Sequence, residues 1–266
     1  MEFETLHPLP EDIRARVVKE LRRIETEYNV TVLYACESGS RAWGFASKNS
    51  DYDVRFIYVP KIDWHLDLDR QRNVIDSQIP EFDLDISGWS LGKTLGLLRK
   101  SNPALLEWLN SPLVYLYRAE RTDLKIYACR QFNPDAAFNH YLNLASGTWK
   151  RFIWNHDDVI YKKYFYALRP LFAIEWVLKY GTMPPTEYEK LVADYGPSPS
   201  LQAAMDELME LKRAGDETRV GPRIFKLDEF IWTKLEEYRT IRVKPPEKPD
   251  DEYLNEFFRR TVRKYD

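Results

Sequence analysis

Two aspartates separated by a single residue carry the strongest chemical signal in this 266-residue chain. Asp51 and Asp53 stand at the start of residues 52–59, a β-branched and aromatic stretch that predicts a strand. Because side chains alternate along a strand, both carboxylates point to the same side. Two like charges at that spacing repel each other, and a bound divalent cation removes the repulsion. The pair predicts a metal site, and Arg55, which shares its side, is expected near that site or in an ion pair.

A third carboxylate for such a site is expected on a neighbouring strand. Residues 82–87 alternate apolar and polar side chains, which predicts a half-buried strand with an acidic face. Asp83 and Asp85 both belong to that face, so the pattern alone does not choose between them. Magnesium prefers few carboxylates together with water and substrate phosphates. Two such ions about 3.5–4 Å apart can activate an attacking hydroxyl and stabilise a departing pyrophosphate.

A turn before the aspartates could hold phosphate. Gly39 and Ser40 follow a predicted strand over residues 30–37, and a turn there exposes backbone N–H groups. Those groups and the Ser40 hydroxyl can bind phosphate oxygens, and Arg41 can add a charge-assisted contact. A Gly-Ser pair alone means little. Its place between a strand and a Ser-Asp-x-Asp strand makes the functional interpretation far more specific.

A second group of candidate residues lies in residues 161–170. Lys162, Tyr166 and Arg169 share one face of a predicted helix, and Lys163 lies next to that face. Cations beside an aromatic ring could grip a triphosphate and stack a base. An amphipathic core helix whose lysines reach solvent explains the same pattern equally well.

The elements that position these residues fall into two halves. The first half mixes strands and helices, and from about residue 121 onward the patterns are helical. Residues 61–80 are polar and without a clear period, which predicts an excursion. The predicted strands are residues 30–37, 52–59, 82–87 and 113–117. The predicted helices are residues 9–28, 90–100, 103–110, 122–131, 135–154, 158–180, 185–194, 199–213, 224–240 and 250–264, with one or two helical turns within 40–46.

Composition excludes several classes of protein. The net charge of −3 disfavours a dedicated duplex-binding protein. It does not exclude a nucleic-acid substrate that binds to a local cluster of Lys and Arg residues. No apolar run approaches the roughly 20 residues that cross a bilayer, and the acidic N-terminus does not have the layout of a signal peptide. Cys36 and Cys129 form neither a disulfide framework nor a zinc site by themselves. We therefore expect a cytoplasmic protein without membrane attachment.

The motifs resemble a known superfamily. Gly39-Ser40 with Asp51-Tyr52-Asp53 is similar to the signature of the DNA polymerase beta-like nucleotidyltransferases, and none of its core motif residues is missing. The run from Glu37 to Phe56 resembles the YcgL-type branch, which includes RNA-ligase-associated members. Residues 84–89, 98–103, 105–109 and 162–171 also resemble that branch.

This resemblance implies an α+β fold, with a polymerase beta-like mixed sheet and flanking helices followed by an all-helical C-terminal domain. It implies a catalytic domain over residues 1–120 and a helical domain over 121–266 that closes the nucleotide cleft. It also implies that Asp51 and Asp53 bind Mg²⁺ or Mn²⁺. We assign Asp85 as the third ligand, because it lies in the family-like sequence Asp-Ile-Ser-Gly-Trp.

The predicted activity is transfer of a nucleoside monophosphate from an NTP, such as ATP, to an acceptor hydroxyl. The RNA-ligase-associated relatives favour an RNA 3′ end, and hence RNA repair, as the acceptor. A protein side chain or a small molecule is the alternative acceptor. Two further hypotheses are a non-catalytic nucleotide-binding regulatory module and an interaction scaffold built on the helical half.

Overall fold

The structure is a computed structural model that describes residues 9–47, 49–69, 72–213, 219–247 and 251–266. Its internal contacts divide the chain into two units. The sheet unit comprises the described residues of Met1–Ala42, Asp51–Phe132 and Glu247–Asp266, and the helical unit comprises those of Trp43–Ser50 and Asn133–Pro246. Neither unit is one continuous stretch of chain.

A mixed five-stranded sheet forms the centre of the sheet unit, in the order β3-β4-β2-β1-β5. Strands β2 and β4 run parallel, whereas the other neighbouring pairs are antiparallel. The fold is therefore α+β. The strands are β1 (Val30–Glu37), β2 (Tyr52–Pro60), β3 (Val74–Ile79), β4 (Leu84–Ser90) and β5 (Val114–Tyr117).

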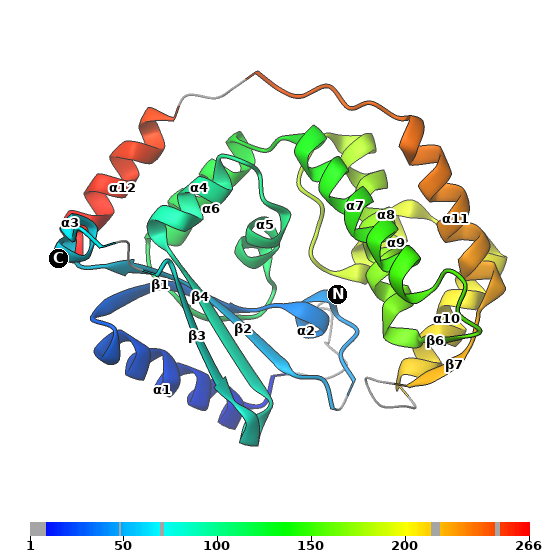
Figure 1. The fold of residues 1–266 in the computed structure, drawn as a ribbon, viewed down its shortest axis with the longest axis horizontal. Coiled ribbons are helices and arrows are strands. Elements are labelled where there is room, and N and C mark those ends of the chain that lie inside the picture. Colours follow the sequence, from blue (N-terminus) through cyan, green and yellow to red (C-terminus); the bar gives the residue numbers. More distant parts are fainter. Residues whose placement is uncertain (1–8, 48, 70–71, 214–218, 248–250) are drawn as a thin grey trace. The chain divides into compact units, whose positions relative to one another are not determined.

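Helix α1 covers one face of this sheet (Figure 1). Its buried residues recur every three or four positions and pack against alternate residues of the strands, such as Val54 and Ile86. This alternation leaves the intervening residues of β2 and β4 on the opposite face. The helices of the sheet unit are α1 (Glu11–Glu27), α2 (Gly39–Trp43), α3 (Ile62–Leu66), α4 (Leu91–Leu98), α5 (Pro103–Asn110), α6 (Glu120–Arg130) and α12 (Glu252–Lys264), with a 3-10 turn η1 (Pro80–Phe82). Trp43, the last residue of α2, already belongs to the helical unit.

Helices α4, α5 and α6 pack against the other face (Figure 1). The Tyr34 hydroxyl of β1 donates a hydrogen bond of 2.6 Å to the Trp108 carbonyl of α5. Helix α12 returns to the same unit, where Lys264 pairs with Glu120 of α6 at 2.6 Å and the Tyr265 hydroxyl donates to Glu120 at 3.0 Å. These contacts make residues 251–266 part of the sheet unit.

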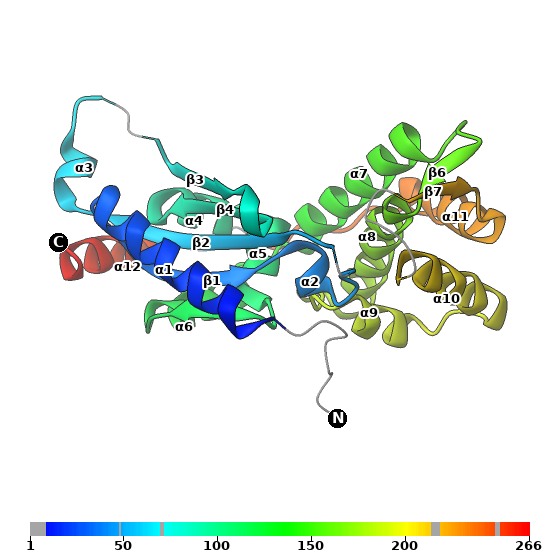
Figure 2. The same ribbon diagram turned by 90° about the horizontal axis from the view of Figure 1, so that it is seen from below.

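Five helices and a small antiparallel sheet make up the described part of the helical unit. Figure 2 shows α7, α8 and α11 side by side. The elements are α7 (Pro134–Phe152), β6 (Asp158–Ile160), α8 (Tyr161–Tyr180), α9 (Tyr188–Tyr195), α10 (Pro199–Arg213), β7 (Val220–Pro222) and α11 (Phe225–Thr240). Residues 43–50 join this unit because Phe45 stacks on Phe165 of α8, with ring centroids 4.6 Å apart.

Several sequence predictions need correction. Residues 61–80 contain α3 and the strand β3, not an excursion. The C-terminal half is not all helical, because β6 pairs with β7. The contacts also divide the chain differently from a single boundary after residue 120. Helix α6 and helix α12 belong with the sheet, since their polar and aromatic side chains pair within that unit.

Candidate functional site

Two of the predicted carboxylates are brought together by the parallel strands β2 and β4. Asp53 and Asp85 are register partners on these neighbouring strands. Both lie on the face of the sheet opposite α1, because Val54, Leu84 and Ile86 occupy the α1 face. Their side chains are 30% and 43% exposed, so solvent and a ligand can reach them.

Arg55 joins the two carboxylates. Its Nη2 atom donates to Asp53 Oδ1 at 2.9 Å and to Asp85 Oδ2 at 2.8 Å. The two carboxylate oxygens are therefore no farther apart than the sum of those distances. The prediction that Arg55 lies near the acids or pairs with one of them is confirmed, and it pairs with two.

Gly39 lies against the Asp53 carboxylate. A Cβ at position 39 would lie 2.0 Å from Asp53 Oδ2, and Gly39 also has a φ of +59°, which disfavours any side chain. The absence of a side chain at residue 39 therefore creates the space that the Asp53 carboxylate occupies.

Glu37, at the end of β1, holds the backbone of Asp53. Its Oε1 accepts the Asp53 N–H at 2.9 Å, and its Oε2 accepts the Tyr115 hydroxyl at 2.5 Å. Glu37 is fully buried, and this burial raises its pKa to about 7 in spite of those hydrogen bonds, which lower it. Glu37 is not predicted as a site residue from the sequence, because an acid at the end of a strand carries no local sign of burial.

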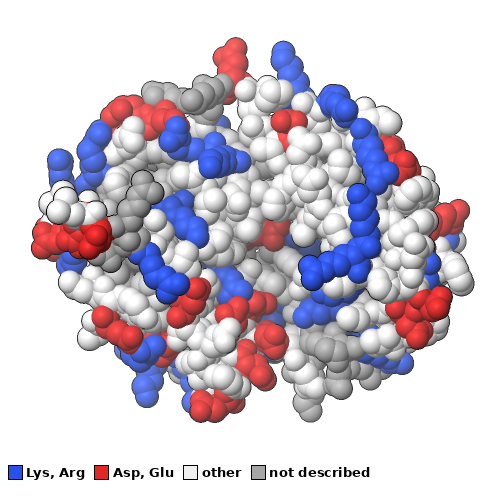
Figure 3. All heavy atoms as spheres, viewed as in Figure 1, with Lys and Arg blue, Asp and Glu red and all other residues white. Residues whose placement is uncertain are grey.

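The other two predicted acids, Asp51 and Asp83, do not contact Arg55 as Asp53 and Asp85 do. Asp51 is exposed just before β2, and its carboxylate makes no ion pair with any residue that the structure describes. Asp83 precedes β4 and has a left-handed backbone, with φ 51° and ψ 38°. The sequence pattern predicts that Asp83 shares the polar face of β4 with Asp85. This prediction is wrong, because the left-handed backbone takes Asp83 out of the alternation, and Asp85 is the acid on that face. Figure 3 shows acidic side chains gathered over the end of the sheet where β3 leads into β4.

The donor set has the chemistry of a cation site with few protein ligands. Asp53 and Asp85 both contact one cationic nitrogen of Arg55, so a single position between them already accommodates positive charge. Within the described residues, no three His, Cys, Asp or Glu side chains form a ready metal cluster. Two carboxylates fit magnesium, which takes most of its remaining ligands from water and phosphates.

The two residues after Gly39 are buried. Ser40 is 5% exposed and Arg41 is 6% exposed. The Arg41 Nε donates to the Asp51 carbonyl at 3.2 Å, and its guanidinium lies 3.9 Å from the centre of the Tyr52 ring. Arg41 thus ties α2 to the start of β2, and its predicted contact with phosphate stays a prediction.

In the helical unit, Arg169 is buried and bound to backbone. It is 2% exposed, donates to the Thr186 carbonyl at 3.2 Å through Nε and Nη2, and lies 4.7 Å from the centre of the Trp43 ring. Tyr166 packs edge-on against Trp43, with centroids 5.3 Å apart. These contacts favour the core-helix interpretation for Arg169.

Lys163 is the more accessible of the predicted nucleotide-binding cations. Its Nζ lies 4.3 Å from the centre of the Phe152 ring and 5.3 Å from that of Tyr166. Partial burial and the neighbouring Lys162 and Arg151 lower the pKa of Lys163. Its predicted role toward nucleotide stays a prediction.

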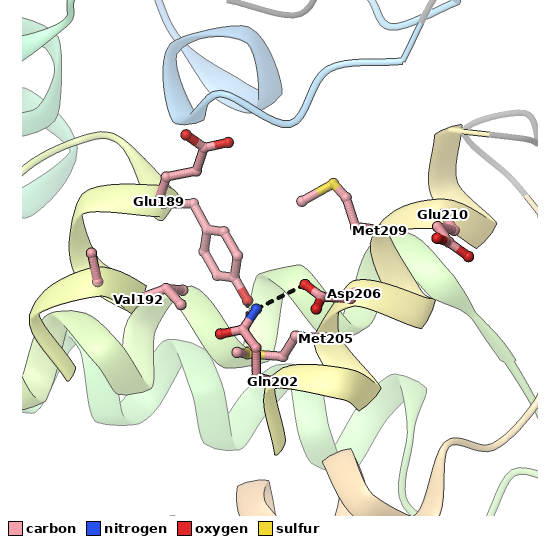
Figure 4. A pocket seen from close by; sticks show the side chains of 9 residues that line it. Glu189, Val192, Gln202, Met205, Asp206, Met209 and Glu210 are labelled. Atoms are coloured by element: carbon pink, nitrogen blue, oxygen red, sulfur yellow. Dashed lines mark hydrogen bonds between the residues drawn. The ribbon is translucent and has the colours of Figure 1, made fainter. Parts of the chain in front are cut away.

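A cavity of about 540 Å³ lies between α9 and α10 (Figure 4). Tyr188, Met205 and Met209 provide apolar surface, and acidic side chains stand along it, with Asp206 accepting the Gln202 amide at 2.8 Å. None of the predicted nucleotide-binding residues lines it. Carboxylates around the cavity would repel a triphosphate, so this cavity does not suit an NTP.

Comparison with known proteins identifies the family. Residues 13–260 match the family described as "RNA repair pathway DNA polymerase beta family". The chain belongs to this family. It is also 46% identical to the uncharacterized protein YcgL of Bacillus subtilis (strain 168) over 226 residues, which cover 84% of this chain and 86% of YcgL. The sequence-based assignment to the polymerase beta-like nucleotidyltransferases is therefore confirmed.

A crystal structure of a nucleotidyltransferase-like protein from Exiguobacterium sibiricum 255-15 aligns with 94% of this chain and 78% of its own, at 15% identity and a TM-score of 0.29.

In the part of the chain that the structure describes, no helix has the length and apolar character that crossing a membrane requires.

Proposed function

We propose that this protein is a metal-dependent nucleotidyltransferase whose reaction takes place at Asp53 and Asp85. The observation that carries the proposal is the convergence of these two carboxylates, from parallel neighbouring strands, on a single cationic nitrogen. Family membership adds the class of reaction.

In this proposal Asp53 and Asp85 would hold Mg²⁺ or Mn²⁺, with Asp51, exposed just before β2, as a further carboxylate ligand. A metal held there would supply activation of an attacking hydroxyl and stabilisation of the departing pyrophosphate. Gly39 leaves room for the Asp53 carboxylate, and Glu37 fixes the Asp53 backbone. These neighbours orient the carboxylate before substrate binds, which avoids reorganisation during the reaction.

We propose an RNA 3′ end as the acceptor. The family description names an RNA repair pathway. A groove of about 470 Å³ beside α1 supplies local positive charge in a chain of net charge −3. Lys19 and Arg22 line it and make no ion pair with the described residues, while Arg16 lies 3.8 Å from the centre of the Phe82 ring. This groove lies on the α1 face, whereas Asp53 and Asp85 lie on the opposite face. In this proposal the track binds phosphates upstream of the RNA 3′ end, and the strand passes around the end of the sheet, where Phe82 leads into β4, to reach the acids.

The decisive experiment follows label from an α-labelled NTP. The protein is incubated with magnesium and, separately, with total RNA, total protein or a small-molecule extract. We expect label in RNA with the wild type and none with Asp53→Asn. Label in protein or in small molecules would replace the RNA assignment by one of those acceptors. Nucleotide binding without transfer to any acceptor would favour a regulatory module.

The RNA track is tested by salt dependence. The double variant Lys19→Gln, Arg22→Gln should bind single-stranded RNA more weakly and lower the slope of log affinity against log salt by about 1.4, since each lost single-strand phosphate contact contributes about 0.7. Lys226→Gln serves as the matched control, because Lys226 is already paired with Glu229. An unchanged slope in the double variant would move the acceptor away from α1.

A further inference from the structure

Arg55 binds the two carboxylates and two backbone carbonyls at the same time. Through Nη2 it donates to Asp53 and Asp85, at 2.9 and 2.8 Å. Through Nη1 it donates to the carbonyls of Val54 and Asp85, both at 3.0 Å. Its side chain is only 18% exposed. One edge of the guanidinium is thus fixed to the sheet backbone, and the other edge faces the acids.

We propose that Arg55 is a resident counter-cation, which neutralises Asp53 and Asp85 before metal binds and yields them to the metal. This inference rests on the proposed function, because it takes the two carboxylates as metal ligands. Nη2 is the atom that must release Asp53 and Asp85 when the metal binds. The two carbonyl contacts through Nη1 involve no carboxylate, so they keep Arg55 at the sheet after the exchange.

The electrostatics of the pair explain why such a cation is useful. Two carboxylates that converge on one point repel each other, and a single guanidinium bound to both reduces that repulsion while the site waits for substrate. The same contacts compete with a metal ion for both carboxylates. Metal without nucleotide therefore binds weakly, whereas a metal–nucleotide complex brings phosphate ligands of its own and can displace Nη2.

Displacement also gives Arg55 a second role. The N–H groups that Nη2 withdraws from the carboxylates become available beside the bound nucleotide, where a phosphate oxygen can accept them. The guanidinium is planar and permanently charged, so it can exchange carboxylate partners for a phosphate without changing its protonation.

A purely structural ion pair makes the opposite prediction about metal affinity. If Arg55 only orients the acids, its removal loosens them and weakens metal binding. If Arg55 competes with the metal, its removal strengthens metal binding. The sign of the change in affinity therefore separates the two roles, and neither requires a measurement of activity.

The test is a titration of the full chain with Mn²⁺ in the absence of nucleotide. Electron paramagnetic resonance measures the concentration of free Mn²⁺ and so gives the affinity. We expect Arg55→Gln to bind Mn²⁺ roughly tenfold more tightly than the wild type, from the loss of two partly exposed ion pairs. Arg55→Lys keeps the positive charge but not the forked guanidinium that contacts both carboxylates, so it should raise the Mn²⁺ affinity less than Arg55→Gln does. Arg118→Gln is the matched control, because Arg118 also binds a backbone carbonyl and an acid, Glu25. Its Mn²⁺ affinity should equal that of the wild type.

Thermal unfolding in EDTA and in Mn²⁺ provides the second measurement. Arg55→Gln should melt lower than the wild type in EDTA and gain more from Mn²⁺, because Asp53 and Asp85 then lack the guanidinium that bridges them. Equal or weaker Mn²⁺ affinity in a folded Arg55→Gln protein would overturn the inference. If that variant does not fold, the affinity of Arg55→Lys decides in the same way.

Asp53→Asn distinguishes failure of this inference from failure of the proposed function. If Asp53→Asn abolishes Mn²⁺ binding while Arg55→Gln leaves it unchanged, the counter-cation is overturned and the metal site stands. If Asp53→Asn binds Mn²⁺ as the wild type does, the metal site at Asp53 and Asp85 is overturned, and the inference about Arg55 falls with it.

Discussion

The sheet unit and the helical unit both bring charged side chains together, but they leave them in different states. In the sheet unit, Asp53 and Asp85 converge and stay 30% and 43% exposed. In the helical unit, Arg169 is 2% exposed and is bound to a backbone carbonyl and an aromatic ring. A charged group that stays accessible after its neighbours have packed is available to a ligand. A buried charge whose donors serve the fold is not.

The largest effect should come from the acids of the sheet unit. Asp53→Asn and Asp85→Asn should each lower kcat/KM by at least 10²–10³, because metal catalysis is worth several kcal/mol and each decade corresponds to about 1.4 kcal/mol. Steady-state kinetics with a labelled NTP measures the loss. Asp76→Asn is the control, since Asp76 accepts a hydrogen bond from Ser87 on the same sheet. Wild-type kcat/KM in Asp53→Asn would remove the chemistry from this unit.

A smaller but still large effect should follow Gly39→Ala. The new methyl group would collide with Asp53 Oδ2 and would also have to adopt a positive φ. We expect a free energy of unfolding lower by about 1–3 kcal/mol and a fall in activity, because the Asp53 carboxylate must move. Urea unfolding and kinetics measure the two effects.

Gly96→Ala provides the matched control for Gly39→Ala. Gly96 is in helix α4, and among the described residues outside the adjoining helix backbone, no atom lies within 4 Å of a Cβ built at this position. That change should leave activity intact and raise stability slightly, by about 0.5–1 kcal/mol, through helix propensity. Equal effects of the two substitutions would show that the space at Gly39 is unimportant.

In the helical unit the expected effect is on stability and not on the reaction. Arg169→Gln should lower the free energy of unfolding by about 1–3 kcal/mol, because it removes buried hydrogen bonds to the Thr186 carbonyl. Lys163→Gln, at a more accessible site, should change that free energy by less than about 0.5 kcal/mol. Urea unfolding compares the two variants. A rise in KM for NTP with unchanged stability in Arg169→Gln would contradict the distinction between the units.

The smallest effect concerns the contact between α12 and the sheet unit. Burial raises the pKa of Glu120, whereas the Lys264 ammonium and the Tyr265 hydroxyl lower it, and the lowering prevails. The folded pKa is therefore below the ordinary value of 4.5. The stabilisation by Glu120 is present above that value and is lost as pH falls through the folded pKa.

Urea unfolding from about pH 5 to about pH 3 should show this loss in the wild type and less of it in Glu120→Gln. The difference should stay below about 1 kcal/mol, because Lys264 is half exposed. At neutral pH the variant should be less stable than the wild type by a similar amount. Identical pH profiles of the two proteins would remove Glu120 from the contacts that retain α12.

The strands that hold the acids are well predicted from sequence because strand alternation relates residue spacing to side-chain direction. Asp53, Arg55 and Asp85 share one side of the sheet as their alternation predicts, although the parallel register of β2 and β4 is visible only in the structure. Asp83 departs from its predicted face because its backbone turns left-handed just before β4. Strand β3 escaped prediction because it is an edge strand with mostly polar residues between Val74 and Ile79.

Each helix of the C-terminal half was predicted from the sequence, but the short strands β6 and β7 and the assignment of the helices to the two units were not. An amphipathic pattern shows that α6 and α12 have an apolar face, and it does not show which partner covers that face. The same limit applies to Arg169, whose spacing fits a ligand grip and an internal contact equally well. Glu37 is the other omission, because its burial depends on Tyr115, which lies 78 residues away in the chain.

The interleaving of the two units has a consequence for the growing polypeptide. Residues 133–246, which form most of the helical unit, leave the ribosome before residues 251–266, whose helix α12 packs into the sheet unit. The helical unit can therefore begin to fold while the sheet unit still lacks α12. Until α12 packs against the sheet unit, the surface that it covers around Glu120 and Tyr127 is open to solvent and to chaperones. The sheet that holds Asp53 and Asp85 is thus the last part of this chain to acquire all of its contacts.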